Sequence, residues 1–334
     1  MMKKNRNASA VIFGFDYQVD AAICLFVRNV SEIEKIRVEG KYEDVEQILS
    51  NGSIIYCQVK SVVDPIIATD SAKRNKIRKA LQSLSECPIT DKDKLIYCSN
   101  QKDILISNSE LYSSNNVLEY EYDYLDKASK EMIKKYFKNQ INKCKSLSII
   151  KIPYNISTDD KTRRAFIYDS VKEFLLSVKE EPTLSYSICR EWHEYLKNSS
   201  YGKPGEFFLT KKELIWVLIA SIISNKIDYD LVDDEQIVDD VKKRCDDLFL
   251  NKLLNFEIFN KLNYIYEEEK MNLVGTKVRI ANIFEKKKGE ILDIIFSKNE
   301  YNDIDGSTAF IIFSAVVRLK NRIKTIKEEC KIED

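Results

Sequence analysis

The sequence contains a single histidine, His193, among 334 residues. His-dependent nuclease mechanisms, His/Cys zinc sites and Ser–His or Cys–His catalysis all need histidine side chains, so these kinds of site are disfavoured. His193 lies in the segment REWHEYL, whose apolar spacing is helical, and we expect it to have a structural role.

Glycine and proline are scarce, at 8 and 5 residues. Their scarcity, together with many Lys, Glu, Leu and Ile residues, favours a helix-rich protein. No Gly-rich phosphate loop is present, which disfavours a nucleotide-driven motor. The 8 cysteines form no C-x-x-C pair, so neither a zinc ribbon nor a disulfide framework is indicated. We expect them to be thiols of a cytoplasmic protein.

The sequence also lacks net charge and long hydrophobic runs. Its 53 Lys and Arg residues balance 53 Asp and Glu residues, so affinity for nucleic acid must come from local patches. The longest apolar run, Leu214–Ile223, is half of the ~20 residues that a membrane-spanning helix needs. We therefore expect no membrane partner.

The functional inference depends on the stretch between Ile36 and Ser61. Three short strands are predicted there, Ile36–Glu39, Asp44–Leu49 and Ser53–Lys60, and the third is rich in β-branched and aromatic residues. The sequence Ser50-Asn51-Gly52 between the last two strands is a hairpin turn signal.

The length of this turn decides which side chains meet. Side chains alternate along a strand, so Gln58 and Lys60 share one face. A three-residue turn, with its glycine in the left-handed conformation, pairs Leu49 with Ser53 and places Asp44 opposite Gln58. Asp44, Gln58 and Lys60 then converge at one end of the hairpin.

A two-residue turn gives a different site. It shifts the register by one residue and brings Glu43 opposite Lys60 instead. We prefer the three-residue turn, because glycine at its last position suits a bulge, and Glu43 remains the alternative to Asp44.

A carboxylate, an amide oxygen and an ammonium on one face have a chemical use. Asp44 can bind a hard divalent cation such as Mg²⁺, and the Gln58 amide and the Val59 main-chain carbonyl can supply two more oxygen ligands. Lys60 can orient or deprotonate a water and stabilise charge on a phosphorane. These residues suit hydrolysis of a phosphodiester. The plainer interpretation is a surface hairpin with scattered charges.

The same residues carry a resemblance to the PD-(D/E)xK nuclease superfamily. The matching residues are Gly14-Phe15-Asp16-Tyr17-Gln18, Glu39-Gly40, Glu43-Asp44 and Gln58-Val59-Lys60-Ser61. Within the superfamily, the chain most resembles the double-stranded-DNA endonuclease domain of CBASS effectors and the nuclease subunit of Lamassu anti-phage systems. The resemblance covers roughly residues 10 to 100. It departs from the commonest pattern at Gln58, where many members have Glu, although Mrr-like restriction enzymes share the Gln-x-Lys variant.

The resemblance implies further roles and partners. It implies a Mg²⁺ or Mn²⁺ cofactor, and a place for Gln18 near the catalytic hairpin. Glu39 or Glu43 would compensate for the charge that Gln58 does not supply. It also implies cleavage of double-stranded DNA by a protein that is homo-oligomeric when active, and that is controlled by partner subunits, including a structural-maintenance-of-chromosomes-like protein.

A basic segment follows the hairpin, at residues 71–79. Its apolar spacing predicts an amphipathic helix with a cationic outer face. Placed just after the catalytic strand, this face can contact DNA phosphates; the alternative is an ordinary solvated face. The candidate DNA contacts are Lys73, Arg74, Lys76, Arg78 and Lys79.

The order of elements predicts an α+β (α/β) restriction-endonuclease-like core with a mixed sheet at residues 1–155. Residues 156–334 read as a mainly α-helical domain for partner binding or oligomerisation, or as a helical support for the nuclease. They are too poor in strand patterns for the cyclic-oligonucleotide-binding domain of CBASS nucleases, which favours the Lamassu-like interpretation.

Two other functions remain open from sequence. One is a stand-alone Mrr-like restriction endonuclease, whose helical domain would carry a basic face; the nearest candidate is Arg318–Lys331. The other is a catalytically inactive nuclease fold that acts as an interaction module. The inactive fold predicts that Asp44, Gln58 and Lys60 do not converge.

Overall fold

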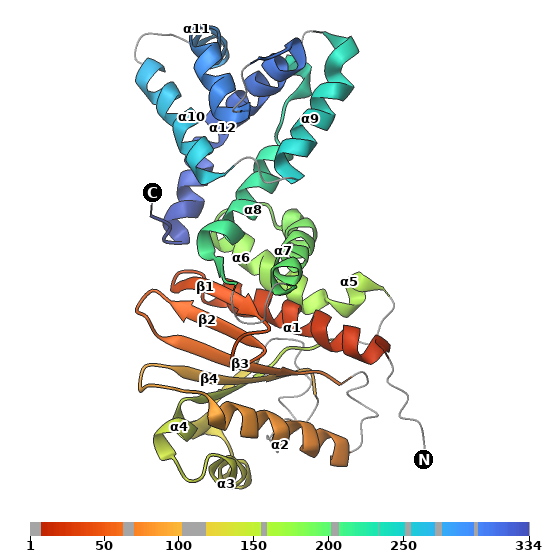
Figure 1. Ribbon diagram of the computed structural model, residues 1–334, viewed down its shortest axis with the longest axis vertical. Coiled ribbons are helices and arrows are strands. Elements are labelled where there is room, and N and C mark those ends of the chain that lie inside the picture. Colours follow the sequence, from red (N-terminus) through yellow and green to blue (C-terminus); the bar gives the residue numbers. More distant parts are fainter. Residues whose placement is uncertain are drawn as a thin grey trace. The chain divides into compact units, whose positions relative to one another are not determined.

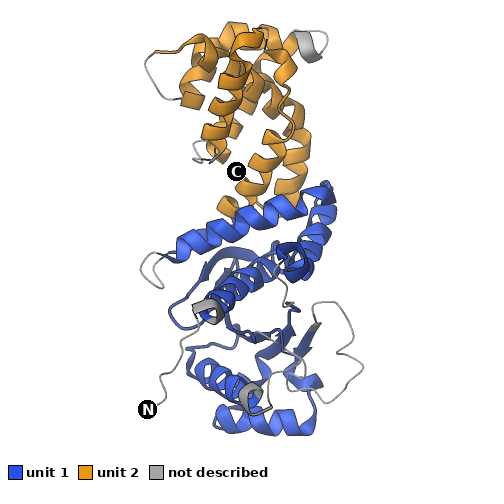
Figure 2. Cartoon of the chain, turned by 90° about the vertical axis from the view of Figure 1, so that its right-hand side faces the viewer, with its two compact units in different colours: residues 1–211 blue, residues 212–334 orange. Residues whose placement is uncertain are grey.

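The computed structural model describes residues 8–62, 70–101, 118–154, 159–201, 207–232, 234–250, 255–270, 276–296 and 300–333. The chain forms two compact units, residues 1–211 and 212–334 (Figure 2). They are described separately below.

Unit 1 is built on a mixed sheet, to which the described residues contribute seven strands. The strands are β1 (Ile33–Val38), β2 (Val45–Leu49), β3 (Ile54–Lys60), β4 (Lys94–Ser99), β5 (Leu118–Glu121), β6 (Leu147–Lys151) and β7 (Leu209–Thr210). Their order is β5-β6-β4-β3-β2-β1-β7. β3 pairs with β4, and β4 with β6, in parallel, whereas the remaining neighbours are antiparallel. The predicted mixed α/β class is therefore confirmed.

Helices cover both faces of this sheet (Figure 1). One face carries α1 (Ala8–Arg28), α5 (Asp160–Arg163), α6 (Ala165–Ser177) and α7 (Ser185–Ser200), and the other carries α2 (Asp70–Glu86), α3 (Lys127–Tyr136) and α4 (Ile141–Lys145). Alternation along the strands supplies an apolar surface to each layer. Tyr56 of β3 and Tyr97 of β4, for example, pack with Leu81 and Leu84 of α2 in one buried cluster.

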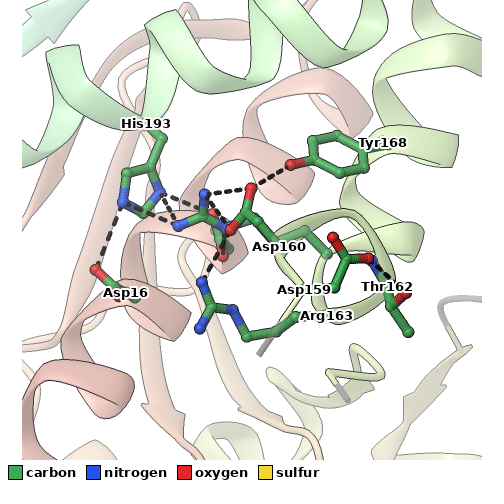
Figure 3. A network of polar contacts seen from close by, with 9 residues as sticks. Asp16, Asp159, Asp160, Thr162, Arg163, Tyr168 and His193 are labelled. Carbon is green, nitrogen blue, oxygen red and sulfur yellow. Dashed lines mark hydrogen bonds and ion pairs between the residues drawn. The ribbon is translucent and has the colours of Figure 1, made fainter. Parts of the chain in front are cut away.

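A network of buried charges joins α1 to the segment that contains α5, α6 and α7 (Figure 3). The Arg164 guanidinium donates from Nε to an Asp20 carboxylate oxygen at 2.8 Å. Nδ1 of His193 lies 2.8 Å from the other Asp20 oxygen, and its Nε2 lies 3.6 Å from Asp16. Asp20 has no exposed surface, and His193 is 3% exposed. These paired charges and the apolar contacts around them hold α6 and α7 against α1.

The two compact units divide at residue 211, whereas the domain boundary predicted from sequence lies near residue 155. The expected boundary followed the change from mixed to helical patterning. Helices α6 and α7 nevertheless pack on α1 and belong to unit 1. β7, which follows them, adds to the edge of the sheet beside β1.

Unit 2 consists of helices and short 3₁₀ turns in the part of the chain that the structure describes. The helices are α8 (Lys211–Ser224), α9 (Val238–Leu250), α10 (Phe256–Glu269), α11 (Thr276–Phe296) and α12 (Asp303–Glu329). The 3₁₀ turns among the described residues of unit 2 are Tyr229–Leu231 and Glu235–Ile237, and those described in unit 1 are Tyr122–Tyr124 and Pro182–Leu184. Helix α8 is apolar nearly throughout, and α12 begins at a capping box between Asn302 and Asp305. None of the described helices combines the length and the apolar character that crossing a membrane requires.

Candidate active site at the end of the hairpin

The β2–β3 hairpin has the register predicted for a three-residue turn. Val45 pairs with Cys57 and Ile48 with Ile54, and the Leu49 N–H donates to the Ser53 carbonyl at 2.9 Å. Gly52, the last turn residue, has a φ of 80°, in the left-handed region that favours glycine. One further step of this register places Asp44 opposite Gln58, and the two-residue alternative, with Glu43 opposite Lys60, is not adopted.

Three donors converge on one carboxylate oxygen of Asp44. The Gln58 side-chain amide donates to Oδ2, the Val59 N–H donates at 2.8 Å and the Lys60 ammonium at 3.0 Å. The Asp44 and Lys60 side chains are 17% and 30% exposed, so solvent reaches the group. Three charge-assisted hydrogen bonds fix the orientation of the carboxylate.

The loop that precedes Asp44 is fixed by a buried ion pair. The Glu46 carboxylate accepts from the Arg37 guanidinium on the neighbouring strand, and its other oxygen accepts from the N–H groups of Tyr42 and Glu43. Gly40 passes so close that a Cβ there would lie 2.5 Å from the Glu46 carboxyl carbon. The loop therefore wraps tightly around Glu46 and delivers Asp44 to the start of β2.

The other two acidic candidates lie close to Asp44, and both have a raised pKa. Burial raises the pKa of Glu43 to about 7, and the Asp44 charge adds to this effect. Glu43 turns toward α2, where the Cys87 thiol lies 3.4 Å from Oε1, while Oε2 is buried with no hydrogen-bond partner in the described structure. Partial burial, followed by the Asp44 charge, raises the pKa of Glu39, whose own φ is 54°.

The end of β3 is held by side chains from β4 and α2. Three successive main-chain carbonyls accept hydrogen bonds from side chains. The Ser99 hydroxyl donates to the Lys60 carbonyl at 2.6 Å, and the Lys76 ammonium donates to the Ser61 carbonyl. The Asn100 side-chain amide donates to the Val62 carbonyl at 2.9 Å. The Asn100 amide oxygen also accepts from the Val62 N–H at 2.8 Å. The backbone beyond Lys60 is thus fixed even though it has left the strand.

The predicted DNA-contacting residues of α2 differ in their surroundings. Arg74, Arg78 and Lys79 are exposed, whereas Lys76 is half-buried against the end of β3. Lys73 belongs to α2, but its side chain lies outside the described residues.

Gln18 was expected near the hairpin because of the resemblance. It lies on α1, which covers the opposite face of the sheet from α2 (Figure 1). Among the described residues, no hydrogen bond connects Gln18 to Asp44, Gln58 or Lys60, so its suggested role stays a prediction.

The oxygen donors at this site suit a hard cation. Asp44 supplies a carboxylate, and Val59 directs its main-chain N–H toward it. Because the N–H and C=O of an extended residue point to the same side, the Val59 carbonyl faces this side of the strand as well. The Gln58 amide must turn over to offer its oxygen. The unpartnered Oε2 of Glu43 is a further carboxylate oxygen within the same loop. The described residues contain no group of three or more His, Cys, Asp or Glu side chains arranged to hold a metal, so any cation depends on amide and main-chain oxygens as well.

Sequence reasoning missed the residues that support the site. Ser99 is the last residue of β4 and Asn100 directly follows it, and β4 proves to be parallel to β3. Because parallel strands end at the same edge of a sheet, polar residues after β4 would have been candidates once that pairing was known. Glu46 and Arg37 carried no comparable signal.

Comparisons of the chain with protein-family models, with curated proteins and with solved structures found no match. Function is therefore inferred from the site geometry together with the motif resemblance.

Proposed function

We propose that the chain is a metal-dependent DNA endonuclease, the effector of a bacterial anti-phage defence system of the Lamassu kind. The observation that carries the proposal is the convergence of Gln58, Val59 and Lys60 on one oxygen of Asp44. This arrangement lies on a mixed sheet that helices cover on both faces, at the end of a hairpin where the side chains remain accessible.

The convergence favours an active site over a scattered set of surface charges. An exposed salt bridge contributes only about 0–1 kcal/mol to stability, so stability alone gives little reason to build one from three donors and a tightly wrapped loop. A catalytic carboxylate, by contrast, needs a fixed position and a fixed charge. The alternative of an inactive nuclease fold predicted that these side chains lie apart, and their convergence argues against it.

Each residue of the site has a role in phosphodiester hydrolysis. Asp44, Gln58 and Val59 would hold a Mg²⁺ or Mn²⁺ ion, which supplies an activated water and neutralises charge on the phosphoryl group. Lys60, held by Asp44, positions its ammonium for hydrogen bonding to the attacking water or to a phosphoryl oxygen. The side-chain bonds from Ser99 and Asn100 keep this end of β3 rigid while the reaction proceeds.

The exposed cations of α2 supply the binding surface for DNA. Arg74, Arg78 and Lys79 lie on the helix that packs against β3, and their charges can contact the backbone beside the scissile bond. Such contacts carry no sequence information, which agrees with a nuclease that cleaves without sequence preference. Cleavage of this kind must be controlled, and we assign that control to partner subunits of a cytoplasmic, oligomeric complex, including a structural-maintenance-of-chromosomes-like protein.

A stand-alone Mrr-like enzyme is the second candidate, and the charges of α12 disfavour it. That enzyme would need a basic face on its helical part. Arg318, however, pairs with Asp228 at 3.0 Å, and Lys320 pairs with Glu267. Because carboxylates pair with these two cations, the charge that they can offer to DNA is reduced.

The test is plasmid cleavage by the purified chain in Mg²⁺ or Mn²⁺. Lys60→Ala and a chelator are the two inactivating conditions, and Lys94→Ala is the matched control, because Lys94 is an exposed lysine at the opposite end of the parallel β3–β4 pair. We expect cleavage by wild type and Lys94→Ala only. Cleavage that survives Lys60→Ala would move the site elsewhere.

A silent chain calls for a second arm, because an effector that is held inactive by its assembly state behaves in the same way. The assay is then repeated with the products of neighbouring genes and with free DNA ends. Continued silence under these conditions would favour the inactive fold.

A further inference from the structure

Lys76 differs from the other cations of α2. Its ammonium donates to the main-chain carbonyl of Ser61, the residue directly after Lys60, and its side chain is half-buried. The neighbouring cations Arg74, Arg78 and Lys79 are exposed. Lys76 thus faces the reaction site, whereas the others face solvent.

Lys76 has no carboxylate within ion-pair distance among the described residues, and its bonded partner is a neutral carbonyl. Burial lowers the pKa of Lys76, and the nearby charge of Lys60 lowers it further. Lys76 bonds to the residue directly after Lys60, so the two ammonium groups repel each other, and among the described residues only Lys60 of the two has a carboxylate partner.

A partly buried cation beside a second cation is unfavourable unless something compensates for it. In a protein that needs only to hold the Ser61 carbonyl, a neutral donor would serve without this cost. An anion placed between the two ammonium groups removes the repulsion and gives each of them a charge-assisted hydrogen bond. A phosphodiester has two unesterified oxygens, one for each ammonium group.

We propose that Lys60 and Lys76 together form a two-ammonium site for a single phosphodiester of double-stranded DNA. The inference rests on the proposed nuclease function and adds to it a binding residue at the reacting phosphate. Arg74, Arg78 and Lys79 then contact flanking phosphates only. The side-chain hydrogen bonds to the carbonyls of Lys60, Ser61 and Val62 fix the end of β3 from which the Lys60 side chain extends and to which Lys76 is bonded.

The test measures binding in a chelator, so that it does not depend on cleavage. The affinity of a fluorescent 20-base-pair DNA duplex is followed by anisotropy over a series of salt concentrations. Lys76→Met removes the charge and keeps an unbranched side chain, and Lys76→Arg keeps the charge.

Lys143→Met is the matched control. Lys143 also donates to two main-chain carbonyls, those of Ser85 and Cys87, at 2.6 and 2.7 Å, but at the opposite end of α2. Lys143→Met therefore shows what the loss of a lysine that only bonds to main-chain carbonyls does to DNA binding.

We expect Lys76→Met to weaken binding roughly three- to tenfold and to lower the salt slope by about one, the value for one lost phosphate contact. Lys76→Arg should restore both quantities, and Lys143→Met should leave the slope unchanged. A Lys76→Met slope equal to that of Lys143→Met would overturn the proposal. A duplex RNA that binds more tightly than DNA and depends more on Lys76 would overturn the assignment to DNA.

A measurement on the unaltered protein guards against misfolded variants. Acetylation of lysines by a water-soluble reagent is followed by mass spectrometry, with and without the DNA duplex. We expect DNA to protect Lys76 and not Lys143, and equal protection of the two would overturn the proposal. If DNA protects Lys76 but no condition gives metal-dependent cleavage, the proposed nuclease function is overturned while the two-ammonium site for DNA is kept.

Discussion

Arg164 and Asp20 are 144 residues apart in the sequence, and the Nε of Arg164 lies 2.8 Å from a carboxylate oxygen of Asp20 in the core of unit 1. Asp20 is on α1, and Arg164 precedes α6. Both side chains are almost entirely buried, so neither charge can be solvated by water. The pair therefore contributes to holding α1 and α6 together only while both partners are present.

The first prediction concerns this pair. Asp20→Asn should destabilise the protein by about 3–5 kcal/mol, because it leaves the Arg164 charge buried without its main partner. Glu119→Gln is the matched control, since Glu119 pairs with Arg28 on the same helix but is about one-third exposed. We expect that change to cost less than about 1 kcal/mol. Urea unfolding measures both, and equal losses would show that Asp20 is not a buried partner.

The second prediction concerns His193 and pH. Burial lowers the pKa of His193, but its hydrogen bonds to the Asp16 and Asp20 carboxylates outweigh burial and the Arg164 charge, so the pKa is raised above 6.5. Because the folded protein holds this proton more tightly than the unfolded chain does, the stabilisation is complete below pH 6.5. It is lost as pH rises through the higher pKa of the folded state.

His193→Gln isolates this contribution. The difference in unfolding free energy between wild type and the variant should be largest near pH 6 and should shrink toward pH 8.5, as measured by urea unfolding at each pH. A difference that is constant, or that grows with pH, would contradict the raised pKa.

The hairpin shows what the sequence could predict. The identity of the turn residues determines the turn length, the turn length sets the register, and the register brings Asp44 to Gln58. Each step is local, so no knowledge of the tertiary structure was needed. The strand Lys94–Ser99 likewise follows from its own residues, KLIYCS, which are rich in apolar side chains.

Other parts of the fold depend on contacts that local patterns do not encode. The lysine-rich segment 127–145 has a helical pattern throughout, but α3 and α4 are separated at Lys138 and Asn139, which have φ values of 49° and 60° without a glycine or proline to signal the break. The Asp20–Arg164 pair, the addition of β7 to the sheet and the approach of Lys76 to Ser61 all require the assembled layers. The polar residues of these contacts looked like ordinary surface residues.

The third prediction concerns Gly40. A Cβ at this position would lie 2.5 Å from the Glu46 carboxyl carbon and 2.7 Å from the Glu43 carbonyl oxygen. Gly40→Ala should therefore displace the loop that delivers Asp44, cost about 1–3 kcal/mol and reduce cleavage sharply. Gly289→Ala in α11 is the control, because a Cβ there meets no atom within 4 Å.

Since alanine favours helix over glycine, the control should keep full activity and gain up to about 1 kcal/mol. Thermal unfolding and plasmid cleavage are compared for the two variants. Full cleavage by Gly40→Ala would mean that the position of Asp44 does not depend on the tight turn.

The fourth prediction concerns the cation at Asp44. Gln58→Glu places a second carboxylate where an amide now donates to the Asp44 oxygen, so without a metal the two oxygens repel each other. The variant should melt at a lower temperature than wild type in a chelator. Added Mg²⁺ should then stabilise it more than it stabilises wild type, because a second carboxylate strengthens the site for a hard cation.

The matched control is Gln47→Glu on β2. Gln47 is fully buried and accepts from the Asn29 amide at 2.9 Å, so this change also buries a carboxylate, but away from Asp44. It should melt at a lower temperature as well, and Mg²⁺ should not restore its stability. If Mg²⁺ raises the melting temperature of the two variants equally, the ion acts on surface charge in general and the proposed site at Asp44 is wrong. Selective rescue of Gln58→Glu would locate the cation at the end of the hairpin independently of any cleavage assay.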